Sequence, residues 1–156
     1  MEEEILLRGK KRALRLLERK DYSRKELRAK LGKDGYEEEI IDQIIAYVDS
    51  YHYLDDARVA GSYIRIRKDG KSRRELEYML RQKGISEEDI STAMEENYKN
   101  EEGIEQEELA VRRQLQKYHV TEEHLEEYTY EEKQKIAAKL YRKGFSQDAI
   151  RKQLKL

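Results

Sequence analysis

Residues 51–85 decide the fold, and they read YHYLDDARVAGSYIRIRKDGKSRRELEYMLRQKGI. An aromatic and acidic junction opens the stretch, followed by an amphipathic segment, a basic corner and a second amphipathic segment. Ser72 and Glu75 stand three residues apart before that second segment, which is the spacing of a capping box at a helix start. Gly84 follows the last apolar residues, where a glycine commonly ends a helix. The stretch therefore predicts two helices joined by a short basic turn.

The second half of this stretch is repeated elsewhere in the chain. An earlier copy lies 49 residues upstream, with Ser23 in the place of Ser72 and Gly35 in the place of Gly84. A looser later copy has Gly144 60 residues after Gly84. Matching positions with matching roles at a fixed offset indicate an internal repeat.

Each copy ends in the same way. Gly35, Gly84 and Gly144 each stand four residues after a leucine, and Tyr36, Ile85 and Phe145 follow them. This is the spacing of a Schellman motif, in which glycine adopts a positive φ and the next apolar residue packs back on the helix. We predict a positive φ at all three glycines.

These repeats predict an all-α fold of about nine helices in three tandem three-helix repeats. The expected boundaries are an N-terminal lead at 1–9, repeat 1 at 10–53, repeat 2 at 54–100 and repeat 3 at 101–156. Units of about 45 residues are too small to be stable alone and should pack on their neighbours. The expected assembly is an elongated, curved solenoid, an architecture that usually serves binding.

Composition excludes several classes of protein. The chain has no Cys, so neither a disulfide framework nor a Cys-based metal site or nucleophile is expected. It has no long apolar run and 43% charged residues, so no membrane span is predicted and a cytoplasmic location is expected. The net charge of −1 hides alternating blocks: residues 65–83 hold eight Lys/Arg against three acids, and 86–108 hold ten acids against one base.

No enzyme is predicted. His52, His119 and His124 are scattered and do not share a helix face, so no metal site is expected. Asp55 and Asp56 could form a carboxylate pair, but a helix start explains them better, with one Asp capping and both favoured by the dipole. No glycine-rich phosphate loop occurs, and no cofactor is expected.

The central block closely resembles that of the RecX regulatory proteins. The resemblance rests on Tyr53 to Ala60 (YLDDARVA), Tyr63, Arg67, Gly70, Arg73, Glu75-Leu76 and Lys83-Gly84-Ile85. The chain departs from the family pattern at Val59, where Phe is common, and at Lys71-Ser72, where Pro often follows the glycine. The resemblance implies a protein without enzymatic activity that binds the RecA recombinase filament on DNA. Such proteins modulate, and mostly inhibit, recombination, ATP hydrolysis and co-protease activity.

Partner-binding and structural residues are separated by helical geometry. Arg58 and Arg65 fall on the polar side of one helix, and Arg74 and Arg81 fall on that of the next. The candidate partner-binding residues are Arg58, Arg65, Lys68, Lys71, Arg73, Arg74 and Arg81, with plain solvated surface as the alternative. The expected structural residues are Tyr53, Asp55, Asp56, Tyr63, Arg67 and the three glycines. Arg67 should reach an acidic partner or the last carbonyls of its helix, and Tyr51 and Tyr53 should pack between repeats.

Two functions stay open at this point. One is a regulator that binds the RecA filament, expected as a monomer; the other is a helical repeat protein that binds nucleic acid directly through its basic segments. The sequence pI of about 6.4 speaks against dominant DNA affinity, although a local basic stripe could still contribute.

Overall fold

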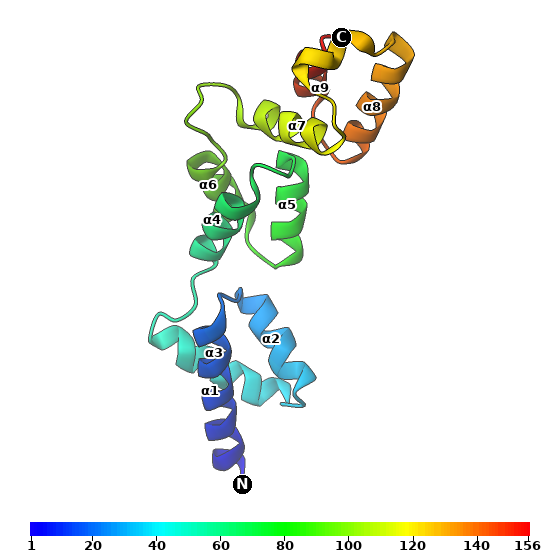
Figure 1. The fold of residues 1–156 in the computed structure, drawn as a ribbon. Helices are drawn as coiled ribbons and strands as arrows, with labels where there is room; N and C mark the ends of the chain where they lie inside the picture. Colours follow the sequence, from blue (N-terminus) through cyan, green and yellow to red (C-terminus); the bar gives the residue numbers. More distant parts are fainter. The chain divides into compact units, whose positions relative to one another are not determined.

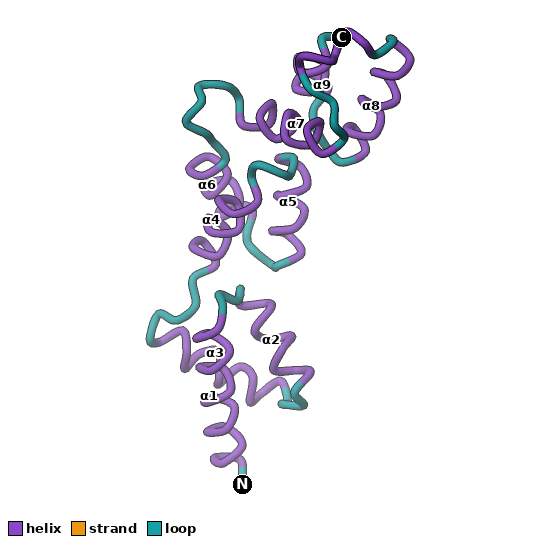
Figure 2. Tube along the Cα trace, viewed as in Figure 1, coloured by secondary structure: helices purple, strands orange, loops and turns teal.

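The computed structural model describes all 156 residues, and its regular elements are all helical (Figures 1 and 2). This confirms the all-α prediction and the number of α-helices, to which a 3-10 helix is added. The elements are α1 (Glu2–Arg19), α2 (Arg24–Lys33), α3 (Glu38–Ser50), α4 (Asp56–Arg67), α5 (Arg73–Gln82), α6 (Glu87–Asn97), α7 (Gln106–Lys117), η1 (Glu122–Glu127), α8 (Tyr130–Arg142) and α9 (Gln147–Leu154).

The helices form two compact units. Unit 1 comprises Met1–Ala60 and Leu80–Ile90, and unit 2 comprises Gly61–Met79 and Ser91–Leu156. The helices α4, α5 and α6 therefore each contribute residues to both units. The repeat boundaries expected from the sequence stay a prediction.

In unit 1, α1 and α2 pack on α3. Buried apolar side chains from all three helices form the core, among them Ala13, Leu27 and Ile44. Gly9 of α1 lies against α3, because a Cβ there would lie 2.3 Å from Ile44 Cδ1. The lead expected at residues 1–9 is the beginning of α1, which continues without a break to Arg19.

In unit 2, α7, η1, α8 and α9 enclose a second core. Its buried side chains include Val111, Leu125, Leu140 and Phe145. Both α7 and α8 pack on α9, as Figure 1 also shows at the C-terminal end of the chain. The acidic connection before α8 is the short helix η1, which places Leu125 in this core.

The three glycines end their helices as predicted. Their φ values are 94° at Gly35, 78° at Gly84 and 96° at Gly144. After each glycine, the next amide donates to the carbonyl of the leucine five residues earlier, at 3.2, 3.2 and 3.3 Å. These bonds are those of a Schellman motif, so the prediction is confirmed.

Two capping serines have a second role that the sequence did not reveal. The Ser23 hydroxyl accepts from the Glu26 amide and also donates to the Lys83 carbonyl at 2.5 Å, a contact we call joint 1. The Ser72 hydroxyl accepts from the Glu75 amide and donates to the Lys143 carbonyl at 3.0 Å, which we call joint 2. Both serines are fully buried. In each joint, the start of one helix meets the glycine end of another.

Two expectations about the central motif are wrong. Tyr51 and Tyr53 are 56% and 46% exposed and stack on each other with ring centroids 5.8 Å apart, rather than packing between repeats. Arg67 is exposed, and its guanidinium lies over the ring of Tyr63, 4.4 Å from the centroid, instead of on a carboxylate or a helix end. The face of a tyrosine ring attracts this cation in place of the acidic partner or helix carbonyls that we expected.

Candidate partner-binding groove

A solvent-open groove of about 780 Å³ lies in unit 2, where the start of α5 and the ends of α7 and α8 come together. Five of its lining side chains are cations, and one, Glu75, is an acid. We call this feature the basic groove. Its lining residues are Gly70, Lys71, Arg74, Glu75, Tyr78, Gln114, Lys117, Tyr141, Arg142, Lys143 and Gly144.

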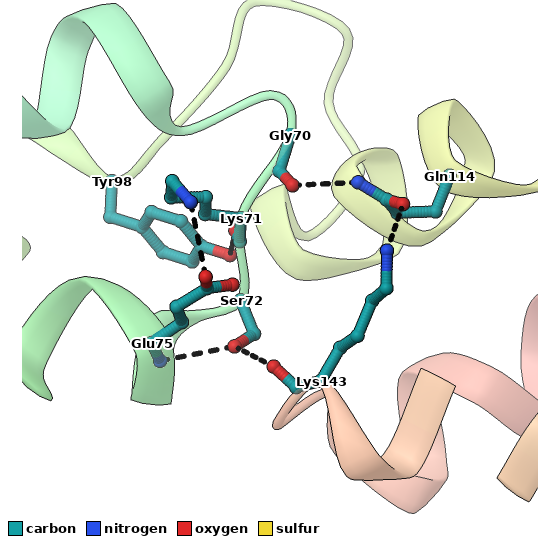
Figure 3. Close-up of polar contacts among 7 residues, drawn as sticks. All are labelled: Gly70, Lys71, Ser72, Glu75, Tyr98, Gln114 and Lys143. Carbon is teal, nitrogen blue, oxygen red and sulfur yellow. Dashed lines mark hydrogen bonds and ion pairs between the residues drawn. The ribbon is translucent and has the colours of Figure 1, made fainter. Parts of the chain in front are cut away.

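Joint 2, drawn in Figure 3, adjoins the basic groove, because Lys143 and Gly144 on its acceptor side line the groove. The Ser72 hydroxyl holds the carbonyl of Lys143, and a Cβ added at Gly144 would lie 2.8 Å from that hydroxyl. The same Cβ would lie 3.4 Å from the Cβ of Arg74. Glycine at this position therefore lets two helix ends meet closely, which brings Arg74 beside the residues that precede Gly144.

The loop between α4 and α5 is fixed by two buried side chains. The Gln114 amide donates to the Gly70 carbonyl at 2.7 Å, and the Tyr98 hydroxyl donates to the Lys71 carbonyl at 3.1 Å. Burial raises the pKa of Tyr98, so its hydroxyl stays protonated and keeps donating over the physiological range. Figure 3 shows both bonds meeting the same short loop. These two bonds hold the loop that forms one wall of the groove.

Several cations of the groove lack an ion-pair partner. Lys71 Nζ pairs with Glu75 at 3.0 Å, and Lys143 Nζ donates to the side-chain oxygen of Gln114 at 3.2 Å. Arg74, Lys117 and Arg142 are exposed and make no ion pair within the chain. Guanidinium groups in this state can bind carboxylates or phosphates with two parallel hydrogen bonds.

Two tyrosines complete the groove. Tyr78 is 57% exposed and Tyr141 is 54% exposed. Exposed tyrosine rings offer a large amphipathic contact area and are enriched at the energetic centres of interfaces. The arrangement therefore combines unpaired positive charge with aromatic surface.

The structure brings two of the seven predicted partner-binding cations, Lys71 and Arg74, into the basic groove. The other five already contact neighbours: Arg58 pairs with Asp21 at 3.2 Å, Arg65 donates to Asn97 at 2.8 Å, Lys68 donates to the Lys99 carbonyl, Arg73 covers the Tyr98 ring at 5.1 Å, and Arg81 pairs with Glu87 at 2.5 Å. Their role in partner binding stays a prediction.

Sequence reasoning missed Lys117, Arg142 and Lys143, and it missed both exposed tyrosines. A signal was present in the offset of 60 residues, which equates the end of α8 with the end of α5. That offset does not reveal that Ser72 at the start of α5 contacts the carbonyl of Lys143.

The acidic pair at the start of α4 has a structural role. Asp55 accepts from the Arg58 amide at 3.1 Å and so caps the helix, as predicted. Asp56 accepts from the backbone amide of Arg24 at 3.0 Å, which is a contact within unit 1.

Across the described chain, no group of three His, Asp or Glu residues is placed to hold a metal ion. No helix combines the length and the apolar character that crossing a bilayer requires.

The repeats match known three-helix domains. Models described as the first, second and third three-helix domains of RecX match residues 10–47, 55–94 and 105–154. The chain belongs to the RecX family. Its relatives carry the name Regulatory protein RecX, which agrees with the prediction that the chain is not an enzyme.

Individual relatives support this membership. The RecX of Caldanaerobacter subterraneus subsp. tengcongensis is 30% identical over 149 residues, covering 95% of this chain and 70% of the relative. The RecX of Clostridium perfringens is 36% identical over 87 residues, or 56% of this chain, and the match spans only 41% of that relative's length. The crystal structure of RecX from Lactobacillus salivarius matches with a TM-score of 0.74 at 24% identity, covering 96% of this chain and 94% of that one. The shared RecX fold is therefore clear.

Proposed function

We propose that this protein binds the RecA recombinase filament on DNA and inhibits recombination, ATP hydrolysis and co-protease activity by occupying the filament. Its membership of the RecX family supports the proposal. The observation that carries it is the basic groove, where Arg74, Lys117 and Arg142 are exposed without carboxylate partners. A protein filament on DNA presents phosphates and acidic side chains together, and a preformed basic surface complements both.

Pull-down with recombinase filaments, assembled with and without DNA, tests this proposal. The groove variant R74Q/K117Q/R142Q removes three unpaired cations without adding acids. We expect the variant to keep its helicity, because no intramolecular ion pair is broken. We expect filament affinity and inhibition of ATP hydrolysis to fall at least tenfold, because the three cations that would contact the filament are gone.

The matched control is K11Q/R15Q/R19Q. These residues are exposed on one face of α1 and change the charge by the same amount. We expect nearly parental binding from this variant. Equal losses in both variants would mean that overall charge, and not the basic groove, governs binding.

A second function, direct binding of nucleic acid, is favoured by Tyr78 and Tyr141 beside the groove cations. Bases can stack on exposed aromatic rings while basic side chains contact the phosphates. A salt titration on naked DNA separates the two functions. Phosphate binding should weaken with a log–log slope of about −0.9 per neutralised phosphate, and the groove variant should flatten that slope. Filament binding that persists without any affinity for naked DNA would favour the first function.

We also propose that the protein acts in the cytoplasm as a monomer. Sedimentation equilibrium, with a monomer mass of 18.8 kDa as the reference, tests the second part.

A further inference from the structure

The two joints of the chain are built from the same parts. Each has a donor end, the seven residues centred on the capping serine, at 20–26 in joint 1 and 69–75 in joint 2. Each has an acceptor end, the six residues that start with the lysine before the glycine, at 83–88 and 143–148. The serine hydroxyl donates to that lysine's carbonyl in both joints. The glycine admits the helix start closely, since a Cβ at Gly84 would lie 2.6 Å from Lys25 Cβ.

One donor end and one acceptor end remain unused. Thr129 occupies the place of the two serines and forms a full capping box with Glu132, yet it is exposed and faces no acceptor carbonyl. Gly35 occupies the place of Gly84 with the same positive φ, and nothing lies within 4 Å of a Cβ built on it. The unused donor end of one copy and the unused acceptor end of another have the shape needed for a third joint, which would link copies of the chain head to tail.

The charges of the unused ends differ from those of the used ones. The used donor ends, 20–26 and 69–75, each carry three bases and two acids. The unused donor end, 126–132, carries four acids and no base. The used acceptor ends, 83–88 and 143–148, each include a lysine, whereas the unused one, 34–39, carries four acids and no base.

We infer that the acidic ends 34–39 and 126–132 keep copies of this chain from joining head to tail. Joining would bring four acids against four, where joint 1 has an ion pair between Lys83 and Glu26 at 2.9 Å. Like charges placed opposite each other at an interface oppose association. Asp34, in the place of Lys83, already pairs with Arg12 of its own chain at 2.8 Å.

The test removes the repulsion and leaves the joint intact. The donor-graft variant E126K/E131K gives 126–132 two bases and two acids, and it leaves the Thr129 and Glu132 capping box in place. We expect the parent to stay monomeric up to about 1 mM, because its acidic ends repel each other. That concentration is the order of the effective concentration which the used joints gain by being intramolecular. The donor graft should associate into chains, with a dissociation constant at least tenfold below that of the parent.

The other end provides an independent variant. D34K/E37S turns DGYEEE at 34–39 into KGYSEE, which matches KGISEE at 83–88 in five of six positions. This acceptor graft should also associate, so a folding failure of one graft leaves the other as a test. Circular dichroism of each variant establishes that it is folded.

Three controls decide the outcome. E2K/E3K changes two exposed acids in the first turn of α1 by the same charge as the donor graft and should stay monomeric. Adding T129A to the donor graft should weaken association, whereas T129S should preserve it. Monomeric grafts, an associating parent, equal association of E2K/E3K, or indifference to T129A would each overturn the inference.

Discussion

Joint 1 and joint 2 use equivalent helix ends, but their side chains pair differently. In joint 1, Lys83 Nζ lies 2.9 Å from Glu26 Oε2 and closes the contact with an ion pair across the joint. In joint 2, the equivalent Lys143 donates to Gln114, while the equivalent Glu75 pairs with Lys71. The acid and the lysine of joint 2 have therefore taken partners other than each other.

The consequence is visible at the neighbouring position. Lys25 lies two residues after Ser23, and Arg74 lies two residues after Ser72, so both pack over the glycine of their joint. Around Arg74, however, stand Lys117, Arg142 and two exposed tyrosines. The same backbone contact is thus closed by an ion pair in one place and bordered by exposed cations and tyrosines in the other. The difference comes from a few side chains that leave the backbone contact unchanged.

The largest effects are expected from alanine at the joint glycines. Gly84→Ala and Gly144→Ala should each lower the free energy of unfolding by about 2 to 3 kcal/mol, since a positive φ costs an alanine 1–2 kcal/mol and the new methyl also meets the facing helix. Gly35→Ala meets nothing and should cost only about 1 kcal/mol. Urea denaturation measures all three. Equal losses at the three sites would show that the joints are not closely packed in solution.

The sequence predicted the parts that depend on local chemistry. The capping box at Ser23 and the glycine ends depend on residues within one helical turn, and all were found as expected. The basic groove was not predicted, because Arg74 and Arg142 are 68 residues apart and meet only through joint 2. A serine that caps its own helix gives no sign in the sequence that its hydroxyl also donates to a distant carbonyl.

Charge reversal at the two equivalent positions should separate binding from stability. Arg74→Glu should lower filament affinity at least tenfold, which is about 1.4 kcal/mol, because it reverses an unpaired cation inside the basic groove. Lys25→Glu changes the same position of joint 1 and should alter affinity less than twofold. The free energy of unfolding of both variants should lie within about 0.5 kcal/mol of the parent's, as is usual for exposed substitutions. A loss of affinity in Lys25→Glu as large as in Arg74→Glu would place the binding surface elsewhere.

A smaller difference should appear in the coupling between the joint lysine and its acid. A double-mutant cycle with Lys83→Ala and Glu26→Ala should give a coupling free energy of about 0.5 kcal/mol, the usual scale for a partly exposed pair. The same cycle with Lys143→Ala and Glu75→Ala should give a value near zero, because these groups have other partners. Equal couplings would show that joint 2 also closes with an ion pair in solution.

The smallest effect should be a difference in the pH dependence of two carboxylates, one in each unit. Burial alone would raise the pKa of Glu26, but the Ser23 amide and the Lys83 ammonium outweigh it and hold that pKa below the ordinary value. Burial raises the pKa of Glu107, and the hydrogen bond from the Ser146 amide at 2.7 Å does not offset this. The two residues should therefore change stability in opposite directions as the pH varies.

The sign follows from which state binds the proton more tightly. Because the pKa of Glu26 is lower in the folded state, its contribution is present above the ordinary value of about 4.3 and disappears as the pH falls through the folded pKa. Because the pKa of Glu107 is higher in the folded state, its contribution is present below about 4.3 and disappears as the pH rises through the folded pKa. Urea denaturation of the parent, Glu26→Gln and Glu107→Gln between about pH 3 and about pH 7 measures both. On acidification, the free energy of unfolding of the parent should fall relative to that of Glu26→Gln. It should rise relative to that of Glu107→Gln. Parallel pH profiles for the two variants would show that the carboxylates do not differ in solution as they do in the structure.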